Sequence, residues 1–286
     1  MKGLILAGGN GTRLWPLTQS ISKQLVPVYD KPLIYYPLST LMSAGIQDIG
    51  VITTPEDQEA FKKLLGDGSA FGIQITYLVQ PKPEGLAQAF IIGEKFIGTS
   101  SVCLILGDNI FHGTDLDVSL KRDFSRSEAR IFAYEVDNPQ EYGVVEFDSA
   151  GKAISIEEKP VAPKSKFAVP GIYFYQNSVI EVAKRIKPSP RNELEITEVN
   201  NHYLTLGKLE VVTLARGTAW LDTGTIDSMF AASNYIKVIE DRQGRKIGCP
   251  EEIAFLSQWI NSEQLSTYVE SRPNNSYMAY LRKLLS

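Results

Sequence analysis

Apolar and polar positions along the first part of the chain predict strands and helices in alternation. Short aliphatic runs, which are typical of strands buried on both faces of a sheet, predict strands over residues 4–7, 48–54, 73–80 and 101–108. Apolar residues at helical spacing predict helices over residues 31–45, 56–65 and 84–96. In the first of these helices, Pro32 lies near the start and Gly45 at the C-terminal cap. Repeated strand–helix units predict an α/β fold with a Rossmann-like, doubly wound, mostly parallel sheet.

The pattern changes at residue 129. Four closely spaced runs predict strands over residues 129–136, 143–147, 153–159 and 168–175. Residues 148–151, with the sequence DSAG, have the composition of a turn between two of these strands. We therefore expect an inserted, more antiparallel region over about residues 129–220.

Helical patterns dominate the remainder of the chain. A strand at 209–214 is flanked by helices over residues 179–186, 195–206 and 227–240, and residues 250–285 are helical with polar breaks. These patterns predict a domain over residues 1–240, whose first half ends near residue 128, and a helical C-terminal extension over 241–286.

Charge and composition exclude several classes of protein. A net charge of −4 and an isoelectric point of about 5.4 argue against a general nucleic-acid-binding protein, but not against a small phosphorylated ligand. Cys103 and Cys249 lie far apart, which predicts free thiols in a reducing cytosol. Only two histidines are present, and no apolar run has the length of a membrane span. We expect a cytoplasmic protein without a membrane partner.

A glycine-rich loop follows the first predicted strand, in the segment GLILAGGNGTRLWPLT. A loop without Cβ atoms lets backbone N–H groups approach anionic oxygens, and an arginine adds a planar charged fork. Gly8, Gly9 and Gly11, with Thr12 and Arg13, therefore indicate phosphate binding. No Lys-Ser/Thr pair follows as in a Walker loop, and Gly9-Asn10-Gly11 lacks the third glycine of the dinucleotide fingerprint. The alternative is an ordinary tight turn.

The carboxyl ends of three predicted strands carry the polar segments that could form a site. Ligands of doubly wound sheets bind beyond these ends. The rule places residues 8–13, residues 80–85 and Asp108 on one rim of the sheet. This expectation depends on fold analogy alone.

Longer motifs around these segments resemble a known family. The segments LILAGGNGTRLWPLT and SKQLVPVYDKPLIYYPL are similar to the signature of sugar-nucleotidyltransferases, and the likeness continues through LGDNIF, EYGVVEFD, IEEKP, ELEITEVN and AWLDTGT. Within that family the chain most resembles the short bacterial glucose-1-phosphate thymidylyltransferases. The resemblance covers nearly the whole chain. It implies the transfer of a thymidylyl group from dTTP to glucose 1-phosphate, giving dTDP-glucose and pyrophosphate, as the first step of dTDP-deoxysugar synthesis.

The resemblance also implies a set of nucleotide-binding residues in the first half, residues 1–128. They are Gly8, Gly9, Gly11, Thr12, Arg13, Lys23, Gln24, Gln80, Gly85, Asp108 and Asn109. Arg13 and Lys23 would act as catalytic residues against the triphosphate, while Gln80 and Gly85 would contact the thymine edge. The alternatives are a solvated loop arginine, an ordinary surface lysine, and turn chemistry imposed by Pro81 and Pro83.

Two aspartates are the implied magnesium ligands and complete the catalytic set. Asp108 follows the fourth predicted strand, and Asp222 lies in WLDTG after another strand. Mg²⁺ prefers hard oxygen donors and typically takes one or two carboxylates together with substrate phosphates. The alternative is a pair of helix N-caps, because both aspartates precede cap-forming residues.

The sugar phosphate would bind to the insertion over residues 129–220. The implied contacts are Gly143, Glu158, Lys159, Val169 and Arg191. Lys159 and Arg191 would hold the phosphate, Glu158 would accept hydrogen bonds from sugar hydroxyls, and Gly143 and Val169 would contribute backbone groups. The alternative for Glu158 and Lys159 is a solvated strand end.

A second, regulatory nucleotide site is common in this family, as is a homotetramer. The implied residues of the second site are His112, Arg216, Cys249, Glu252, Ile253 and Leu256. His112 stands where tyrosine is usual and Leu256 where a basic residue is common, so we expect weak feedback inhibition by dTDP-sugars. The apolar C-terminal helices could form an interface between subunits.

Three other functions remain as alternatives. A relative could use another base or another sugar phosphate, which a panel of nucleotides would reveal. A nucleotide-sugar sensor could have kept the pocket and lost turnover, although Arg13, Lys23, Asp108 and Asp222 are all present. A dinucleotide-dependent oxidoreductase is disfavoured by the missing third glycine.

Overall fold

The structure is a computed structural model that describes residues 1–9, 11–123, 125 and 127–286. Asn10 of the glycine-rich loop lies outside the described residues. No described helix is both long and apolar enough to cross a membrane.

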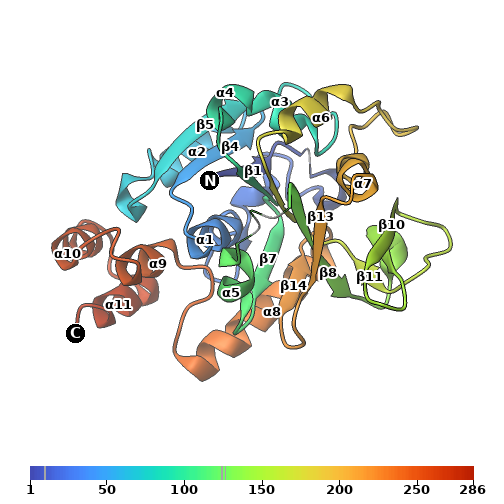
Figure 1. Cartoon of the computed structure of the whole chain (residues 1–286). Helices are drawn as coiled ribbons and strands as arrows, with labels where there is room; N and C mark the ends of the chain where they lie inside the picture. The colour runs from blue at the N-terminus through green and yellow to red at the C-terminus, as the bar shows by residue number, and fades with distance from the viewer. Residues whose placement is uncertain (10, 124, 126) are drawn as a thin grey trace.

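A large mixed sheet forms the centre of the molecule (Figure 1). Among the described residues, ten strands belong to it, in the order β10–β9–β11–β8–β12–β6–β1–β4–β5, with β13 paired to β8. Their bounds are β1 (Lys2–Ala7), β4 (Asp48–Thr53), β5 (Gln74–Val79), β6 (Val102–Leu106), β8 (Ala129–Glu135), β9 (Gly143–Phe147), β10 (Ala153–Glu158), β11 (Phe167–Ala168), β12 (Ile172–Tyr175) and β13 (Leu209–Thr213). Strands β5, β4, β1 and β6 are parallel to their neighbours in this group, whereas β12 joins antiparallel to β6. The antiparallel insertion therefore continues the same sheet.

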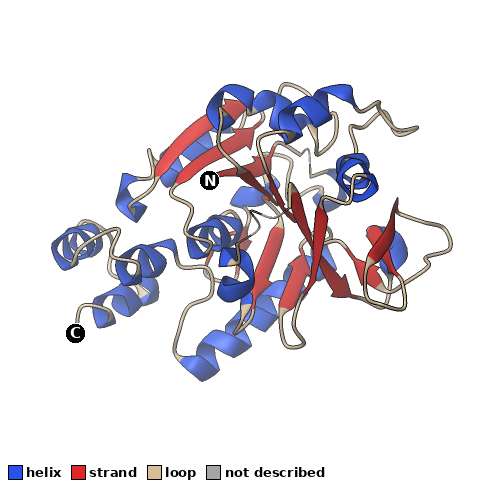
Figure 2. Ribbon diagram, in the orientation of Figure 1, coloured by secondary structure: helices blue, strands red, loops and turns tan. Residues whose placement is uncertain are grey.

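Helices cover both faces of this sheet (Figure 2). Their bounds are α1 (Tyr35–Ser43), α2 (Gln58–Leu65), α3 (Gln88–Ile92), α4 (Glu94–Ile97), α5 (Leu116–Lys121), α6 (Val179–Arg185), α7 (Ile196–Thr205), α8 (Ile226–Gln243), α9 (Pro250–Leu256), α10 (Ser262–Glu270) and α11 (Ser276–Lys283). The expected doubly wound α/β fold with an antiparallel insertion and a helical C-terminus is confirmed.

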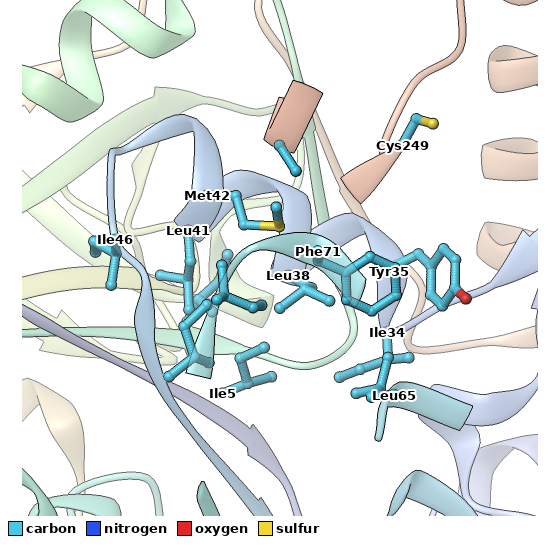
Figure 3. Packing of buried hydrophobic residues seen from close by; sticks show 14 of the residues in the cluster. Ile5, Ile34, Tyr35, Leu38, Leu41, Met42, Ile46, Leu65, Phe71 and Cys249 are labelled. Atoms are coloured by element: carbon cyan, nitrogen blue, oxygen red, sulfur yellow. The ribbon is translucent and has the colours of Figure 1, made fainter. Parts of the chain in front are cut away.

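Alternate residues of each central strand enter two different cores, because successive side chains of a strand point to opposite faces. Ile5 packs in one core with α1, α2 and the C-terminal helices, while Leu4 packs in the other with α3, α4, α6 and α7. Figure 3 shows the first core, where Ile5, Leu38 and Phe71 lie close to one another. Strands buried on both faces explain why their sequences are continuous aliphatic runs.

Some expected boundaries were wrong for identifiable reasons. The single strand expected over residues 168–175 is divided, since β11 ends at Ala168 and β12 starts at Ile172. Pro170 has no N–H to donate, and the N–H of Gly171 donates to the side chain of Asn109. The helix expected from residue 84 starts at Gln88, since the backbone groups of Glu84 and Ala87 are hydrogen-bonded to Leu194. Pro32 lies in a short strand rather than in α1.

Several short elements were not expected from the sequence, although a strand before Asp222 was. Strand β7 (Asn109–His112) pairs antiparallel with β14 (Ala219–Asp222), and β2 (Pro27–Val28) pairs with β3 (Lys31–Pro32). Residues from the β2–β3 hairpin, β7 and α8 pack together in a third hydrophobic core. Helix α5 was also not expected.

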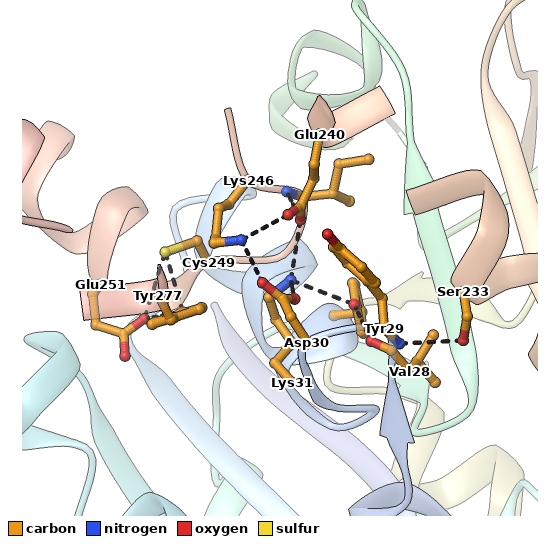
Figure 4. Close-up of polar contacts among 12 residues, drawn as sticks. Val28, Tyr29, Asp30, Lys31, Ser233, Glu240, Lys246, Cys249, Glu251 and Tyr277 are labelled. Atoms are coloured by element: carbon orange, nitrogen blue, oxygen red, sulfur yellow. Dashed lines mark hydrogen bonds and ion pairs between the residues drawn. The ribbon is translucent and has the colours of Figure 1, made fainter. Parts of the chain in front are cut away.

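A cluster of charged residues joins the β2–β3 hairpin to the end of α8 and the following loop (Figure 4). Lys31, which is almost fully buried, contacts Asp30 at 2.5 Å and Glu240 at 3.2 Å. Lys246 contacts Glu240 at 2.7 Å and also pairs with Asp30. These contacts connect segments that are distant in the sequence and fix the path of the chain into the C-terminal helices.

Candidate functional site

Asp108 and Asp222 are brought together by the small β7–β14 sheet. Asp222, the last residue of β14, lies opposite Asn109, the first residue of β7. Thr223, which is fully buried, donates its backbone N–H and its hydroxyl to the carbonyl oxygen of Asp108, at 3.2 and 2.8 Å. The two aspartates thus lie at one end of the same short ladder.

Neither aspartate caps a helix, so that alternative is wrong. Asp108 is followed by strand β7, and the cap of α8 is Thr225, whose hydroxyl accepts a hydrogen bond from the N–H of Ser228. The carboxylates of Asp108 and Asp222 are therefore not used as helix N-caps.

Lys23 forms an ion pair with Asp108. Its ammonium lies 2.6 Å from Oδ2 of Asp108, and its side chain is 7% exposed. The other carboxylate oxygen, Oδ1, accepts a hydrogen bond of 2.8 Å from the side-chain amide of Asn109. Asp108 is thus held on both oxygens.

Asn109 occupies a buried position behind Asp108. Its Oδ1 accepts hydrogen bonds from the N–H of Gly171 at 3.1 Å and from Nε1 of Trp220 at 2.6 Å. Because both partners can only donate, the amide nitrogen must point toward Asp108. Sequence analysis assigned Asn109 to the nucleotide and missed this positioning role, and the motifs LGDNIF and AWLDTGT gave no sign that their Asn and Trp meet.

The Asp222 carboxylate lies in an environment that disfavours its charge. Burial is the main cause of a raised pKa at Asp222, and the nearby negative charge of Asp108 adds to it. The positive charges of Lys23 and Arg13 act in the opposite direction. A Cβ built on Gly224 would lie 3.4 Å from a guanidinium nitrogen of Arg13 and 3.2 Å from Oδ2 of Asp222, so these groups flank the same glycine.

The glycine-rich loop meets the end of β5. A Cβ on Gly8 would come within 2.2 Å of Oε1 of the buried Gln80, so any side chain at position 8 would require the Gln80 amide to move. Gly11 has a φ of 57°, and its carbonyl accepts a hydrogen bond from the Thr18 hydroxyl. Gly9 and Thr12 are exposed, and nothing lies within 4 Å of a Cβ built on Gly9. The loop thus leaves backbone open to solvent beside buried polar groups.

Gln80, Gln24 and Gly85, which were also predicted to bind the nucleotide, have protein partners of their own. Nε2 of the buried Gln80 donates to Gln88 at 2.6 Å. Gln24 is also buried, and its Oε1 accepts a hydrogen bond from Ser22. Gly85 has a φ of 106°, and a Cβ there would lie 2.4 Å from the backbone nitrogen of Leu194. The close approach of the loop at Leu194 therefore explains a glycine at position 85 without any contact to a ligand.

A cavity of about 320 Å³ opens beside the two aspartates. Four sequence-predicted residues of the catalytic and nucleotide sets line it, namely Arg13, Asp108, Asn109 and Asp222. All five of the predicted sugar-phosphate set also line it, namely Gly143, Glu158, Lys159, Val169 and Arg191. The rest of the nucleotide set lies outside this lining, in the glycine-rich loop, in the helical turn Lys23–Leu25, and just after the end of β5.

The far end of the cavity carries a network of carboxylates. Glu158 accepts a hydrogen bond of 2.6 Å from the hydroxyl of Thr197 and contacts Arg191 at 3.3 Å. Arg191 binds Glu195 through two hydrogen bonds of 2.9 Å and also contacts Glu193. The ELEIT motif contains Glu193, Glu195 and Thr197, but sequence analysis did not assign these residues.

Lys159 differs from Arg191. It adopts a φ of 42°, and its backbone N–H donates to the carbonyl of Tyr142. Its side chain is exposed at the cavity, and no ion pair to it is present among the described residues. Lys159 and the equally exposed Arg13 are therefore both available to an anionic ligand, whereas Arg191 is already paired with carboxylates.

Comparison with known proteins identifies the family. The model of the family described as "Nucleotidyl transferase" matches residues 2–238. This chain belongs to the nucleotidyl transferase family. The glucose-1-phosphate thymidylyltransferase of Mycolicibacterium smegmatis is 59% identical over 285 residues, covering 100% of this chain and 99% of that one. The enzyme of the same name from Neisseria meningitidis is 56% identical, with the same coverage.

Solved structures agree with this assignment. A putative glucose-1-phosphate thymidylyltransferase from Bacillus anthracis, crystallised in complex with a sucrose, has a TM-score of 0.76 and 41% identity, and the match covers 82% of this chain and 94% of that one. A UDP-glucose pyrophosphorylase complexed with UDP-glucose has a TM-score of 0.71 and 25% identity, with 83% and 98% covered. This chain is thus similar to nucleotidyl transferases in both sequence and fold.

The charge balance of this nucleotidyl transferase suits a divalent metal ion, which members of the family generally need. Among the described residues that line the cavity, carboxylates outnumber cations six to three. No group of three or more His, Cys, Asp or Glu side chains that could hold a metal occurs in the described part of the chain. Asp108 and Asp222 lie at one end of the β7–β14 ladder, and a pair of carboxylates leaves coordination positions of a divalent ion open for phosphate oxygens and water.

A second cavity, of about 300 Å³, lies away from the first one, between α1, β7 and α9. His112, Cys249, Glu252 and Ile253 line it, together with Lys246 of the charged cluster. Burial lowers the pKa of His112, whose Nδ1 lies 2.9 Å from the hydroxyl of Tyr235. Arg216 and Leu256 are exposed and are not part of this lining, so the structure brings together four of the six predicted residues.

Proposed function

We propose that this nucleotidyl transferase transfers a thymidylyl group from dTTP to glucose 1-phosphate, giving dTDP-glucose and pyrophosphate. The close similarity over the full chain to enzymes named glucose-1-phosphate thymidylyltransferase supports this substrate pair. The observation that carries the proposal is the junction at Asp108 and Asp222. There, two carboxylates, Lys23 and Arg13 adjoin a cavity large enough for a sugar phosphate.

The chemistry needs positioning more than acid–base catalysis. A phosphate oxygen of glucose 1-phosphate attacks the α-phosphorus of dTTP, and the bond from that phosphorus to the oxygen that bridges it to the β-phosphorus breaks. A phosphate monoester is already mostly dianionic at neutral pH, because its second pKa is about 6. The enzyme therefore has to hold two anions in line and offset their charge.

In this proposal the triphosphate lies along the glycine-rich loop. The backbone of Gly8, Gly9, Gly11 and Thr12 would approach its oxygens, and Lys23 and Arg13 would neutralise its charge. Arg13 would assist the departure of pyrophosphate. The buried Gln80, together with Gly85 and the buried Gln24, would contribute to the pocket of the base.

A magnesium ion would be held by Asp108 and Asp222. When bound, it would supply positive charge to the phosphate oxygens. Asn109 and Thr223 would keep the two carboxylates in place through their hydrogen bonds to Asp108.

The sugar phosphate would occupy the cavity. Lys159 would bind its phosphate, and Arg191 would join it there while remaining oriented by Glu195. Glu158 would accept hydrogen bonds from sugar hydroxyls, and the backbone of Gly143 and Val169 would close the cavity beside them.

The second cavity is a candidate regulatory site for a dTDP-sugar. His112, Cys249, Glu252 and Ile253 would contact the ligand, and the exposed Arg216 and Leu256 would lie at its edge. Because Leu256 supplies no charge, inhibition should be weak, and Leu256→Arg should strengthen it. Titration of dTDP-rhamnose at saturating dTTP tests this, and an unchanged inhibition constant in the variant would remove position 256 from the site.

A homotetramer in the cytoplasm is the assembly and location that the family resemblance suggests. Both cysteines are free and buried, which suits a reducing compartment. Sedimentation of the purified protein would give its oligomeric state.

The decisive experiment is a substrate panel. The protein is mixed with Mg²⁺, glucose 1-phosphate and each dNTP or NTP in turn, and pyrophosphate release is measured. Fastest release with dTTP supports the proposal. Preference for another nucleotide or sugar phosphate would indicate a different transferase, and binding without turnover would indicate a nucleotide-sugar sensor.

A further inference from the structure

The two aspartates of the site differ in what they contact. Both oxygens of Asp108 are held by protein side chains, Oδ2 by the Lys23 ammonium at 2.6 Å and Oδ1 by Asn109 at 2.8 Å. For the carboxylate of Asp222, no hydrogen bond or ion pair is present among the described residues. The Asp108 carboxylate is therefore neutralised by the Lys23 ammonium, whereas the Asp222 carboxylate has no side-chain partner among the described residues.

Lys23 is placed so that its ammonium could serve two partners. A Cβ built on Gly11 would lie 3.4 Å from Cβ of Lys23, so the lysine stem starts beside the glycine-rich loop. From there the side chain extends to Asp108. A lysine carries a compact charge on a flexible four-carbon stem, and modest rotations of that stem move the ammonium between neighbouring anions.

A divalent cation on Asp108 would meet this ammonium at close range. Both cations would contact the same carboxylate group, and like charges a few ångströms apart repel strongly in a partly buried site. Anionic phosphate oxygens on the adjacent loop would offer Lys23 a second partner. Its departure would leave Oδ2 of Asp108 free.

We propose that Lys23 acts as an internal placeholder cation on Asp108, so that a divalent metal ion binds the two aspartates well only after a nucleoside triphosphate has drawn the ammonium away. This inference rests on the proposed function, since it takes the triphosphate to lie on the glycine-rich loop. No covalent bond forms or breaks in the exchange. Because of this exchange, the metal ion and the nucleotide would bind together.

Metal affinity in the absence of nucleotide tests the inference. Mn²⁺ is titrated into the full-length protein without nucleotide or sugar phosphate, and the free ion is measured by electron paramagnetic resonance. The wild-type protein should bind Mn²⁺ weakly. Lys23→Met should bind it at least about tenfold more tightly, because a charge that competes for Asp108 is gone.

Matched variants separate the placeholder from a general charge effect. Lys23→Arg keeps the positive charge and should retain the weak binding of the wild type. Combining Lys23→Met with Asp108→Asn should abolish the gain, because the freed carboxylate is then absent. Lys23→Gln replaces Lys23→Met if the latter does not fold, as judged by circular dichroism.

Three outcomes would overturn the inference. They are tight Mn²⁺ binding by the wild-type protein without nucleotide, no gain in either neutral variant, and an equal gain in the Asp108→Asn background. The first needs no variant, so the inference stays testable if both substitutions prevent folding. Failure of the proposed function would appear separately, as the absence of dTTP-dependent pyrophosphate release by the wild-type protein.

Discussion

Thr223 donates two hydrogen bonds to the main-chain carbonyl of Asp108, one from its backbone N–H at 3.2 Å and one from its hydroxyl at 2.8 Å. These bonds join the residue after Asp222 to Asp108 across two segments that are distant in the sequence. They hold the two carboxylates of the proposed metal site in one geometry.

Removing the hydroxyl of Thr223 should loosen this geometry. Thr223→Val has nearly the same shape, and we expect it to lower stability by about 1 kcal/mol and turnover by about tenfold. Thr223→Ser keeps the hydroxyl and serves as the matched control. Thermal unfolding and steady-state kinetics measure both effects, and equal turnover in the two variants would show that this bond does not position the aspartates.

Neutralising either aspartate should remove most activity. We expect Asp108→Asn and Asp222→Asn each to reduce turnover at least about a hundredfold while the fold persists, because each removes charge from the proposed metal site. Pyrophosphate release and circular dichroism provide the two measurements. Near-normal turnover in either folded variant would exclude that aspartate from the metal site.

Asp222→Asn should also stabilise the fold when no metal is bound. The folded-state pKa of Asp222 is raised above its ordinary value of 3.8, chiefly by burial and then by Asp108. Stability is therefore lost as pH rises from 3.8 to the raised pKa, and the loss persists at neutral pH. In EDTA at pH 7, the variant should melt about 1–3 °C higher than the wild type. This advantage should vanish below the ordinary pKa, and a lower melting temperature at pH 7 would contradict the prediction.

Arg13 and Lys159 should affect different substrates. Lys159 is exposed at the cavity without an ion-pair partner among the described residues, so Lys159→Ala should raise the KM for glucose 1-phosphate about tenfold or more. Arg13→Ala should mainly lower kcat, at least about tenfold, because in the proposed reaction its charge would act on the departing pyrophosphate. Lys62→Ala removes a surface lysine paired with Glu59 and is the control. The same kinetic profile in both site variants would disprove this division of roles.

Gly85 should tolerate no side chain. Its φ of 106° and the 2.4 Å approach of a built Cβ to Leu194 predict that Gly85→Ala loses about 2 kcal/mol or more. Gly244→Ala is the control, because Gly244 has a φ of 65° with nothing within 4 Å, and should lose about 1 kcal/mol. Urea unfolding compares the two, and equal losses would show that the contact with Leu194 yields on substitution.

The sequence by itself determined the sheet and its helices. Aliphatic runs located β1, β4, β5 and β6 to within one or two residues, because a strand covered on both faces needs apolar side chains at successive positions. It also located the turn at residues 148–151, where the Asp148 carboxylate accepts two backbone hydrogen bonds and Gly151 adopts a φ of 77°. These features depend on neighbours in the chain, so a local pattern is enough to predict them.

The motifs located the candidate site, but they did not show how its residues meet. Only the tertiary structure shows that β7 pairs with β14 and that Gly85 packs against Leu194. It also shows the ion pairs between Lys23 and Asp108 and between Arg191 and Glu195. Each of these contacts depends on the distance and direction between side chains, which packing across the sheet fixes and which residue spacing does not encode. The sequence therefore determined which chemical groups are present, and the fold decided which of them are already paired with each other and which remain open to a substrate.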